Sequence, residues 1–139
     1  MKELDSERIE ELSIEGNTFM DDALYEKAIQ KFSKALDLVP APKMEWGESL
    51  WLFASIGDAY FQLKKYKEAF ENFMQAYKCP DGNSNPFVNL RIGQCYYELH
   101  DEKNAIEYLL RAYMIEGIEI FDEAKSYYDF LSSKVKLDK

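Results

Sequence analysis

The sequence has few of the residues that most often carry catalysis or bind metal ions. It contains one histidine, His100, and two cysteines, Cys79 and Cys95, which stand far apart in the chain. One histidine and two separated cysteines do not supply the paired ligands of a zinc site, and no serine or cysteine stands in the motif of an activated nucleophile. The sequence also lacks a glycine-rich phosphate loop and a calcium-binding loop. We therefore expect a protein that is not an enzyme, with no catalytic residue, no cofactor and no metal site.

Long apolar runs are also missing. No stretch approaches the roughly 18 apolar residues that cross a membrane. The first residues, from Met1 to Glu7, are polar and acidic, and they lack the apolar core of a signal peptide. These features predict a cytoplasmic protein, in which Cys79 and Cys95 remain reduced and behave as small buried hydrophobic residues.

Positive charge is scarce. The chain holds 17 Lys and Arg against 26 Asp and Glu, a formal net charge of −9. Such a chain repels nucleic acid and anionic lipid, so neither is an expected partner. The acidic excess has two interpretations, which are plain solubility and attraction to a basic partner. The charge is unevenly spread, because residues 1–26 carry only Lys2 and Arg8 against the acids Glu3, Asp5, Glu7, Glu10, Glu11, Glu15, Asp21, Asp22 and Glu26.

Hydrophobic and aromatic residues, by contrast, are abundant, at 47% and 15% of the chain. A chain of 139 residues with this composition can bury the core of a single domain, 1–139, and is not disordered. An internal repeat follows Gly16, Gly57 and Gly93, because the residues three, twelve, thirteen, sixteen and nineteen positions later are alike. In order they are Phe19, Ala28, Ile29, Phe32 and Ala35, then Tyr60, Ala69, Phe70, Phe73 and Ala76, then Tyr96, Ala105, Ile106, Leu109 and Ala112.

This pattern predicts pairs of antiparallel helices. A glycine on the first helix and alanines on the second allow the two backbones to approach closely. The large residues sixteen positions after the glycines fill the space around that contact. One such hairpin cannot bury its apolar face alone, so neighbouring hairpins must stack to form a continuous core.

The repeat resembles the tetratricopeptide repeat, whose motif places W-x2-L-G-x2-Y, then A-x3-F, then P over about 34 residues. The resemblance covers roughly residues 6–117. It implies an all-α, right-handed α-solenoid of three antiparallel helix hairpins plus a C-terminal capping helix. The expected parts are repeat one at about 6–40, repeat two at about 43–80, repeat three at about 85–117 and the capping helix at about 118–136. The residues that match are Leu12, Gly16, Phe19, Ala28, Phe32, Ala35 and Pro40, then Phe53, Ile56, Gly57, Tyr60, Ala69, Phe73, Ala76 and Pro80, then Ile92, Gly93, Tyr96, Ala105, Leu109 and Ala112.

The spacing departs from the motif before repeat two. Gly16 and Gly57 are 41 residues apart, and the excess of two helical turns predicts that the first helix of repeat two begins early, near Lys43. After Gly117, apolar residues recur at helical spacing as far as about Val135. This stretch predicts one amphipathic capping helix, polar on its outer side as the ends of repeat arrays require.

Repeat three has several features that set it apart from the other two. A turn-rich loop precedes it and ends in Asn85, which we expect to cap the next helix, with Pro86 at the first helical position. Asn89 stands where the motif has a large apolar residue, and we expect it to weaken the packing at the start of this repeat. His100 falls in the expected turn between the two helices, where a solvated histidine is the simplest interpretation.

Proteins of this family usually hold a peptide or a helix on their concave side, which the first helix of each hairpin lines. The resemblance therefore implies a partner-binding groove. We expect Trp51, Phe87 and Tyr97 to supply most of the binding energy there, with Asp58 and Arg91 setting the orientation. Trp51 and Phe87 could instead pack between adjacent repeats. The expected partner-binding residues are Asn17, Trp51, Ser55, Asp58, Phe87, Arg91, Gln94, Tyr97 and Glu98.

Some family members clamp the C-terminal tail of a chaperone. Their clamp consists of Lys and Asn from repeat one, Asn from repeat two, and Lys and Arg from repeat three. Asn17 and Arg91 match that pattern, whereas Ser13, Ser55 and Phe87 replace both lysines and an asparagine. The sequence therefore argues against a chaperone co-factor of this kind.

The sequence favours a monomeric, non-enzymatic protein–protein interaction module that binds a partner protein or peptide, possibly a basic one, in its groove. Alternatives within this class are an immunity protein that neutralises a toxin and a chaperone of a bacterial secretion system. Two further alternatives are a hydrolase built on Asp58, Arg91 and Glu98, and a structural piece of a larger assembly. The fold by itself does not decide among them.

Overall fold

The computed structural model describes residues 4–137, so Lys2 and Glu3 of the acidic N-terminal segment lie outside the described residues. The described chain is entirely helical, without a strand between residues 4 and 137. None of its helices is long and apolar enough to cross a membrane. The elements are α1 (Ser6–Asp21), α2 (Tyr25–Asp37), η1 (Lys43–Glu45), α3 (Gly47–Gln62), α4 (Tyr66–Lys78), η2 (Gly82–Ser84), α5 (Pro86–Glu98), α6 (Glu102–Glu116), η3 (Ile118–Phe121) and α7 (Lys125–Lys134), where η denotes a 3-10 helix.

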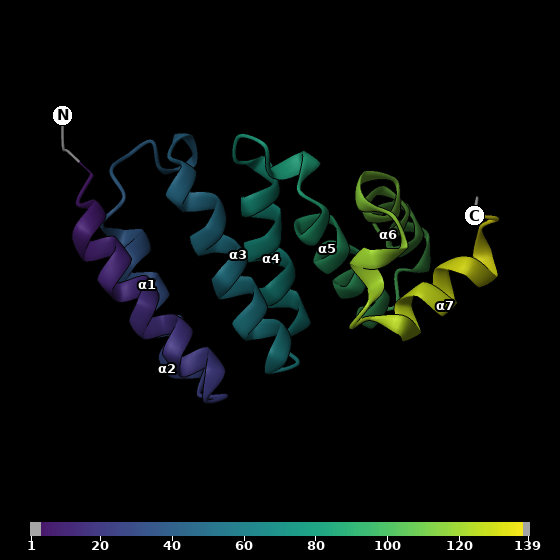
Figure 1. Ribbon diagram of the computed structural model, residues 1–139, viewed down its shortest axis with the longest axis horizontal. Helices are drawn as coiled ribbons and strands as arrows, with labels where there is room; N and C mark the ends of the chain where they lie inside the picture. The colour runs from purple at the N-terminus through teal and green to yellow at the C-terminus, as the bar shows by residue number, and fades with distance from the viewer. Residues whose placement is uncertain (1–3, 138–139) are drawn as a thin grey trace.

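The helices form three hairpins that stack in chain order. The most extensive contacts join α1 to α2, α3 to α4 and α5 to α6, and further contacts join α2 to α3 and α4 to α5. Figure 1 shows the hairpins in a row along the long axis, with α1 at one end and α7 at the other. The predicted all-α solenoid of three hairpins and a cap is therefore confirmed.

The repeated glycines lie where two helices of a hairpin approach most closely. A Cβ atom at Gly16 would fall 2.5 Å from Cε1 of Phe32, and one at Gly93 would fall 2.8 Å from Cδ2 of Leu109. No side chain fits at such distances. The six repeated alanines face the same seams and are completely buried: Ala28, Ala35, Ala69, Ala76, Ala105 and Ala112.

The core consists of three clusters, each shared by neighbouring parts of the array. The first joins α1 and α2 to Leu52 and Ile56 of α3. The second joins α3 and α4 to α5, and it includes Cys79 and Cys95. The third joins α5 and α6 to residues of the C-terminal cap, including Leu131. Each hairpin thus completes its core with the next element, as expected for a repeat array.

The turns inside the three hairpins share one geometry. Each contains a residue with positive φ, namely Ala23 (58°), Lys64 (62°) and His100 (67°). In each turn the next amide donates to the carbonyl of the repeated aromatic residue, at 2.8 Å in the first turn and 2.9 Å in the other two. These bonds satisfy carbonyls at the helix end. His100 is exposed in this turn, as the sequence predicts.

The connection between the first two hairpins differs from the prediction of an early helix. Residues 43–45 form the short η1, and Trp46 is extended (φ −91°, ψ 133°), so α3 begins only at Gly47. The Nζ of Lys43 donates to the carbonyls of Leu36 (3.0 Å) and Val39 (2.6 Å), which close the end of α2. Lys43 is therefore tied to the end of α2, and the extended Trp46 separates its short helix from α3.

Asn89 has a structural role beyond the weakened packing that its polarity predicts, although its Oδ1 is buried without a hydrogen-bond partner among the described residues. Its side chain is fully buried. Its Nδ2 donates to the carbonyls of Asn83 (3.1 Å) and Asn85 (2.9 Å), which holds the loop before α5 against the helix. The cap prediction is confirmed, since Asn85 accepts from the amide of Val88 and Pro86 opens the helix.

The C-terminal cap is shorter than the single helix predicted for residues 118–136. Gly117 has φ of +91° and ends α6, and η3 then reverses the chain before α7 begins at Lys125. The apolar residues whose spacing predicts one helix are indeed buried, because Phe121, Ala124 and Leu131 all belong to the third core cluster. They reach it from two separate elements.

Candidate partner-binding face

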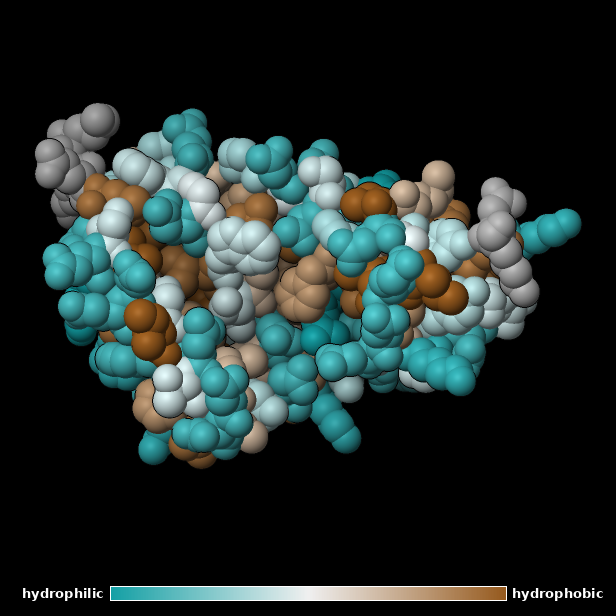
Figure 2. Space-filling view, in the orientation of Figure 1, coloured by the Kyte–Doolittle hydropathy of each residue, from teal (hydrophilic) through white to brown (hydrophobic). Residues whose placement is uncertain are grey.

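The first helices of the three hairpins, α1, α3 and α5, present one face of the molecule, which we call the A-helix face. Two hollows lie on it. The N-terminal pocket, of about 200 Å³, lies between α1 and α3. The C-terminal pocket, of about 610 Å³, lies between α3, α5 and the connection from α6 to α7. Figure 2 shows hydrophobic side chains in the hollow between α1 and α3 and near the α6–α7 connection, with hydrophilic side chains around them.

The N-terminal pocket brings together three of the predicted residues. Asn17 on α1 and both Trp51 and Ser55 on α3 line it, together with the buried Ile9 and Leu52. Trp51 is 61% exposed, because its neighbours Leu50 and Leu52 take the buried sides of α3. A large exposed indole beside an apolar floor is a typical anchor for a partner protein.

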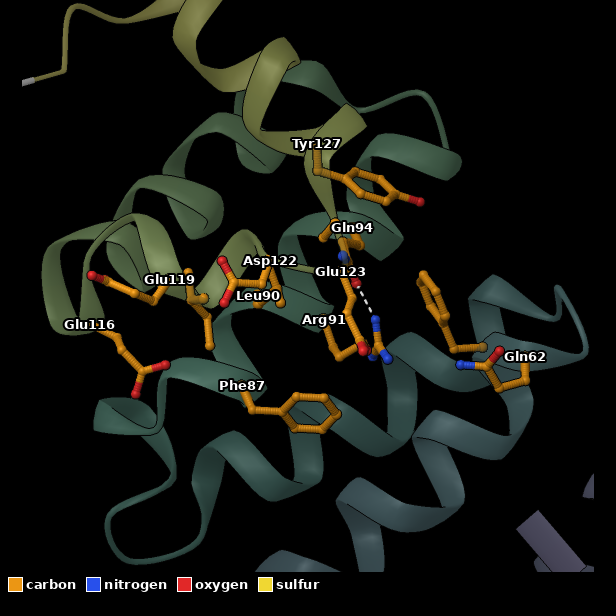
Figure 3. A pocket seen from close by; sticks show the side chains of 13 residues that line it. Gln62, Phe87, Leu90, Arg91, Gln94, Glu116, Glu119, Asp122, Glu123 and Tyr127 are labelled. Carbon is orange, nitrogen blue, oxygen red and sulfur yellow. Dashed lines mark hydrogen bonds between the residues drawn. The ribbon is translucent and has the colours of Figure 1, made fainter. Parts of the chain in front are cut away.

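The C-terminal pocket brings together three more predicted residues, Phe87, Arg91 and Gln94, which stand on one side of α5 (Figure 3). Phe87 is half-buried and also meets the ring of Phe73 edge-on, with centroids 6.0 Å apart. The alternative that an aromatic residue packs between repeats therefore holds in part for Phe87. It does not describe Trp51, whose side chain is mostly in solvent.

Arg91 is held on four sides. Its guanidinium lies 4.6 Å from the ring centre of Phe61 and 5.0 Å from that of Phe87. Its Nη2 pairs with Asp58 at 3.1 Å, and its Nη1 donates to Gln94 at 2.7 Å. Aromatic faces and a carboxylate both favour the cation, so the guanidinium is fixed without a ligand. Asp58 thus lies at the junction between α3 and α5, beside the C-terminal pocket.

The last two predicted residues, Tyr97 and Glu98, are engaged by the cap. The ring of Tyr97 packs edge-on against Tyr127, at 5.5 Å, and Phe130, at 4.7 Å. Glu98 accepts a hydrogen bond of 2.6 Å from the hydroxyl of Tyr127. Burial, and then this bond to a carboxylate, raise the pKa of Tyr127. These contacts tie α5 to α7, and neither Tyr97 nor Glu98 lines either pocket.

Sequence reasoning missed an acidic rim on the C-terminal pocket. The rim consists of Glu116 at the end of α6 and Glu119, Asp122 and Glu123 in the connection to α7, all exposed (Figure 3). The sequence does carry a signal for this rim, because four acidic residues fall between positions 116 and 123. A helix prediction for this stretch spread them around a helix, whereas the turn at Gly117 brings them to one side of the pocket.

Both cysteines are free and buried. Burial raises the pKa of the Cys95 thiol to about 12, and burial also raises that of Cys79. A thiol with a raised pKa and no access to solvent is a poor nucleophile. Among residues 4–137, no three His, Cys, Asp or Glu side chains are arranged to hold a metal ion.

Comparisons with known proteins agree with this geometry. The family model described as tetratricopeptide repeat matches residues 52–78 and 88–117, which belong to the second and third hairpins. No curated protein sequence gives a significant match. The solved structures that resemble the chain include three of 20–23% identity, a level at which the similarity establishes the fold.

The first of these is the first TPR of Spaghetti (RPAP3) bound to the HSP90 peptide SRMEEVD, with a TM-score of 0.74, 23% identity, and coverage of 93% of this chain and 97% of that one. The Sgt2 TPR domain from Aspergillus fumigatus has a TM-score of 0.71 and 22% identity, covering 90% of this chain and 75% of that one. MamA has a TM-score of 0.69 and 20% identity, covering 93% of this chain and 79% of that one.

Proposed function

We propose that this chain, which matches the tetratricopeptide repeat model in its second and third hairpins and has the fold of such domains, is a non-enzymatic interaction module that binds a basic segment of a partner protein on its A-helix face. The observation that carries the proposal is the pair of hollows on this face. Each combines an apolar wall with polar side chains, which is the usual composition of a recognition site. In the C-terminal pocket the polar side chains of Arg91 and Gln94 are also held in place by their own contacts.

The two pockets offer complementary anchors. Trp51 gives the N-terminal pocket a large exposed aromatic surface. Arg91 gives the C-terminal pocket a guanidinium that is already ordered by Asp58 and two aromatic rings. Trp and Arg are the residue types most enriched at the energetic centres of interfaces. A side chain that is ordered before binding loses little conformational entropy when the partner arrives.

A basic partner suits this surface better than an acidic one. The HSP90 peptide in the similar structure, SRMEEVD, carries three acidic residues. In this chain Ser13 and Ser55 line the N-terminal pocket, where the chaperone clamp has lysine and asparagine, and Phe87 replaces the second lysine. The C-terminal pocket adds four carboxylates against one guanidinium, and the whole chain carries −9. An acidic peptide would meet repulsion on this face, whereas a basic peptide would be attracted.

The enzymatic alternative has little support from the side chains that would carry it. Asp58 and Arg91 pair with each other, and Glu98 accepts from Tyr127. His100 is exposed in a turn, away from both pockets. Acid–base catalysis requires a positioned group within reach of the substrate, and these groups are committed to holding helices together.

Affinity capture with matched baits tests the proposal. The baits are the wild-type protein, Trp51→Ala, and Leu24→Ala, which removes an exposed apolar residue from a turn outside both pockets. We expect a protein captured by the wild type and by Leu24→Ala, with a basic segment, whose purified form binds Trp51→Ala about thirtyfold more weakly, a loss of about 2 kcal/mol. Equal binding to all three baits would place the interaction on another face and overturn the proposal.

Salt dependence tests the charge component separately. If the acidic surface attracts the partner, the association rate should fall as salt rises, because the screening length falls from about 10 Å at 0.1 M to about 3 Å at 1 M. An association rate that does not change with salt would show that electrostatic attraction to a basic partner segment is not part of the binding. The binding face itself would still stand on the Trp51 result.

A further inference from the structure

The C-terminal pocket contains a feature that the repeat itself does not provide. Its inner wall comes from α3 and α5, but its acidic rim comes from the connection between α6 and α7. This connection departs from the repeat at Gly117, whose φ of +91° turns the chain out of α6. The rim is therefore a property of this chain's C-terminal cap.

The turn also places one carboxylate of the rim. Oε2 of Glu119 lies back over Gly117, 2.9 Å from the position that a Cβ there would take. Any larger residue at 117 would displace this carboxylate. Asp122 caps the end of η3, Glu123 follows it, and both line the pocket. In Figure 3 Asp122 is drawn beside Glu119, and Glu123 is drawn near Arg91 and Gln94.

The floor of the pocket holds an amide side chain whose donor is not used within the described residues. Gln94 is only 1% exposed and lines the pocket. Its Oε1 accepts from Arg91, while its Nε2 makes no hydrogen bond with any of residues 4–137. The buried unpaired side-chain atoms of residues 4–137 are Oδ1 of Asn89 and Nε of Arg91, and Nε2 of Gln94 is not among them, so this donor is open to the pocket. A ligand carbonyl within the pocket would replace water as its acceptor.

The guanidinium of Arg91 does not neutralise the rim. Its charge is already balanced by Asp58 at 3.1 Å. The four rim carboxylates therefore remain available to an incoming cation. They are spread along an edge and not gathered around one point, since no three acids among residues 4–137 are arranged to hold a metal ion. A row of this kind suits a cation carried on a long flexible side chain.

The pocket wall suits the uncharged part of such a side chain. Phe87, Leu90 and Ile120 give it an apolar surface beside the rim. Lysine and arginine lay their methylene stems along apolar surface while the charged group reaches a polar environment. An apolar wall and a carboxylate edge thus suit the side chain of a lysine or arginine, and the amide donor at the floor suits a backbone carbonyl of the same segment.

We propose that the C-terminal pocket is a specificity subsite for one lysine or arginine of an extended peptide segment. The stem of that residue lies on Phe87 and Leu90, and its charged group reaches the acidic rim. The peptide carbonyl next to it accepts a hydrogen bond from Nε2 of Gln94. This subsite rests on the proposed function, because it requires that the A-helix face holds a partner segment, and it adds which residue the face selects.

Selection from a phage-displayed library of random peptides on the immobilised wild-type protein tests the subsite. We expect the selected peptides to share a lysine or arginine at one position of their alignment. Fluorescence polarisation with a synthetic selected peptide should show about a tenfold loss of affinity when norleucine, an uncharged residue with a similar stem, replaces that lysine, a loss of about 1.4 kcal/mol.

Two neutralised proteins separate the rim from general electrostatic attraction. The rim variant carries Glu119→Gln, Asp122→Asn and Glu123→Gln. The control carries Glu26→Gln, Glu68→Gln and Glu71→Gln, which remove the same charge at exposed positions of α2 and α4 outside both pockets. We expect the rim variant to bind the lysine peptide about tenfold more weakly and the norleucine peptide unchanged. The control should keep nearly full discrimination between the two peptides. Unfolding curves of all three proteins verify that they remain folded.

A second readout follows the pocket floor. The side-chain amide resonances of Gln94 in a nitrogen–proton correlation spectrum should shift on addition of the lysine peptide, because their donor gains an acceptor. A selected peptide that leaves these resonances in place would overturn the carbonyl contact.

The outcomes distinguish the two proposals. Peptides that lose affinity for Trp51→Ala but discriminate lysine from norleucine equally well with the rim variant would overturn the subsite and leave the proposed function intact. Peptides that bind Trp51→Ala and the rim variant at full strength would overturn both, as would a library that yields no specific peptide.

Discussion

The ring of Phe73 occupies the space that a side chain on Gly57 would need. A Cβ atom at position 57 would lie 2.9 Å from Cε2 of Phe73, and Phe73 is completely buried, so its ring has no room to move away. The same pairing of a glycine with a large residue recurs in the other two hairpins. The distance between the two helices of a hairpin is thus set by the absence of one methyl group.

Substitution of Gly57 by alanine should therefore destabilise the protein. We expect Gly57→Ala to lower the free energy of unfolding by about 1–3 kcal/mol through overpacking. Urea denaturation followed by circular dichroism measures this change. The control is Gly47→Ala at the start of α3, where a Cβ has nothing within 4 Å. That substitution should be neutral within about 0.5 kcal/mol, and a Gly57→Ala protein as stable as this control would contradict the packing described here.

Trp51 and Phe87 should differ in their effect on stability. Trp51 is 61% exposed, so Trp51→Ala should change the free energy of unfolding by less than about 0.5 kcal/mol. Phe87 packs on both Phe73 and Arg91, so Phe87→Ala should cost about 1–3 kcal/mol. Thermal melts of both variants, with Phe73→Ala as the fully buried reference at about 3–5 kcal/mol, give the ranking. A large loss for Trp51→Ala would show that it serves the core.

The ion pair of Asp58 and Arg91 should contribute more than a surface pair. Its side chains are 26% and 18% exposed, and the guanidinium also lies against two aromatic rings. A double-mutant cycle with Asp58→Asn and Arg91→Met should give a coupling energy of about 1 kcal/mol or more. The matched cycle on Arg8 and Glu11, an exposed pair at 3.1 Å, should give less than about 0.5 kcal/mol. Equal coupling energies would contradict the ordered state assigned to Arg91.

The hydrogen bond from Tyr127 to Glu98 should make stability depend on pH in the alkaline range. Burial and the neighbouring carboxylate raise the pKa of Tyr127 in the folded protein above its unfolded value of 10.0. The unfolded state therefore loses this proton first as the pH rises, and the stabilising contribution is complete below about pH 10 and declines above it. Tyr127→Phe should make this decline shallower in urea denaturation measured from about pH 8 to pH 11.

Glu98→Gln is the control for the cause of that effect. It keeps an acceptor for the hydroxyl but removes the negative charge that opposes tyrosinate formation, so it should flatten the alkaline decline only in part. Tyr66, Tyr96 and Tyr108 also have raised pKa values, so some decline remains in every variant. A Tyr127→Phe protein with an unchanged pH profile would contradict the assignment.

Sequence reasoning predicts the hairpins well because their packing is periodic. The contact that Gly16 makes with Phe32 is repeated by Gly93 with Leu109, so one physical requirement appears three times at the same spacing. Sequence reasoning also locates Trp51 and Arg91 on the A-helix face, because the side of the helix on which a residue lies follows from its sequence separation from the repeated glycine. The six buried alanines are predicted for the same reason.

The ends and connections of the repeats are harder to predict because nothing repeats there. Tyr97 has the right phase for the groove, but the element that follows the third hairpin is the cap, and Tyr127 and Phe130 of α7 pack against the ring of Tyr97, which stays 37% exposed. Placing Tyr97 in the groove from its distance to Gly93 assumes that another helix hairpin follows the third one. The acidic rim depends on the turn at Gly117, a single backbone angle that helical periodicity does not report. Lys43 likewise is engaged by carbonyls of α2, a contact between an irregular segment and a helix end.

The position of Cys95 makes it a natural reporter of how often the core of this protein opens. Its thiol lies in the core cluster that α3 and α4 share with α5, and its pKa of about 12 leaves almost no thiolate while the core is closed. Because Cys95 is completely buried, a disulfide reagent can reach the sulfur only when the core around it opens. The rate at which Cys95 is labelled in a Cys79→Ala protein would then measure how often this core opens, in native buffer and without any denaturant.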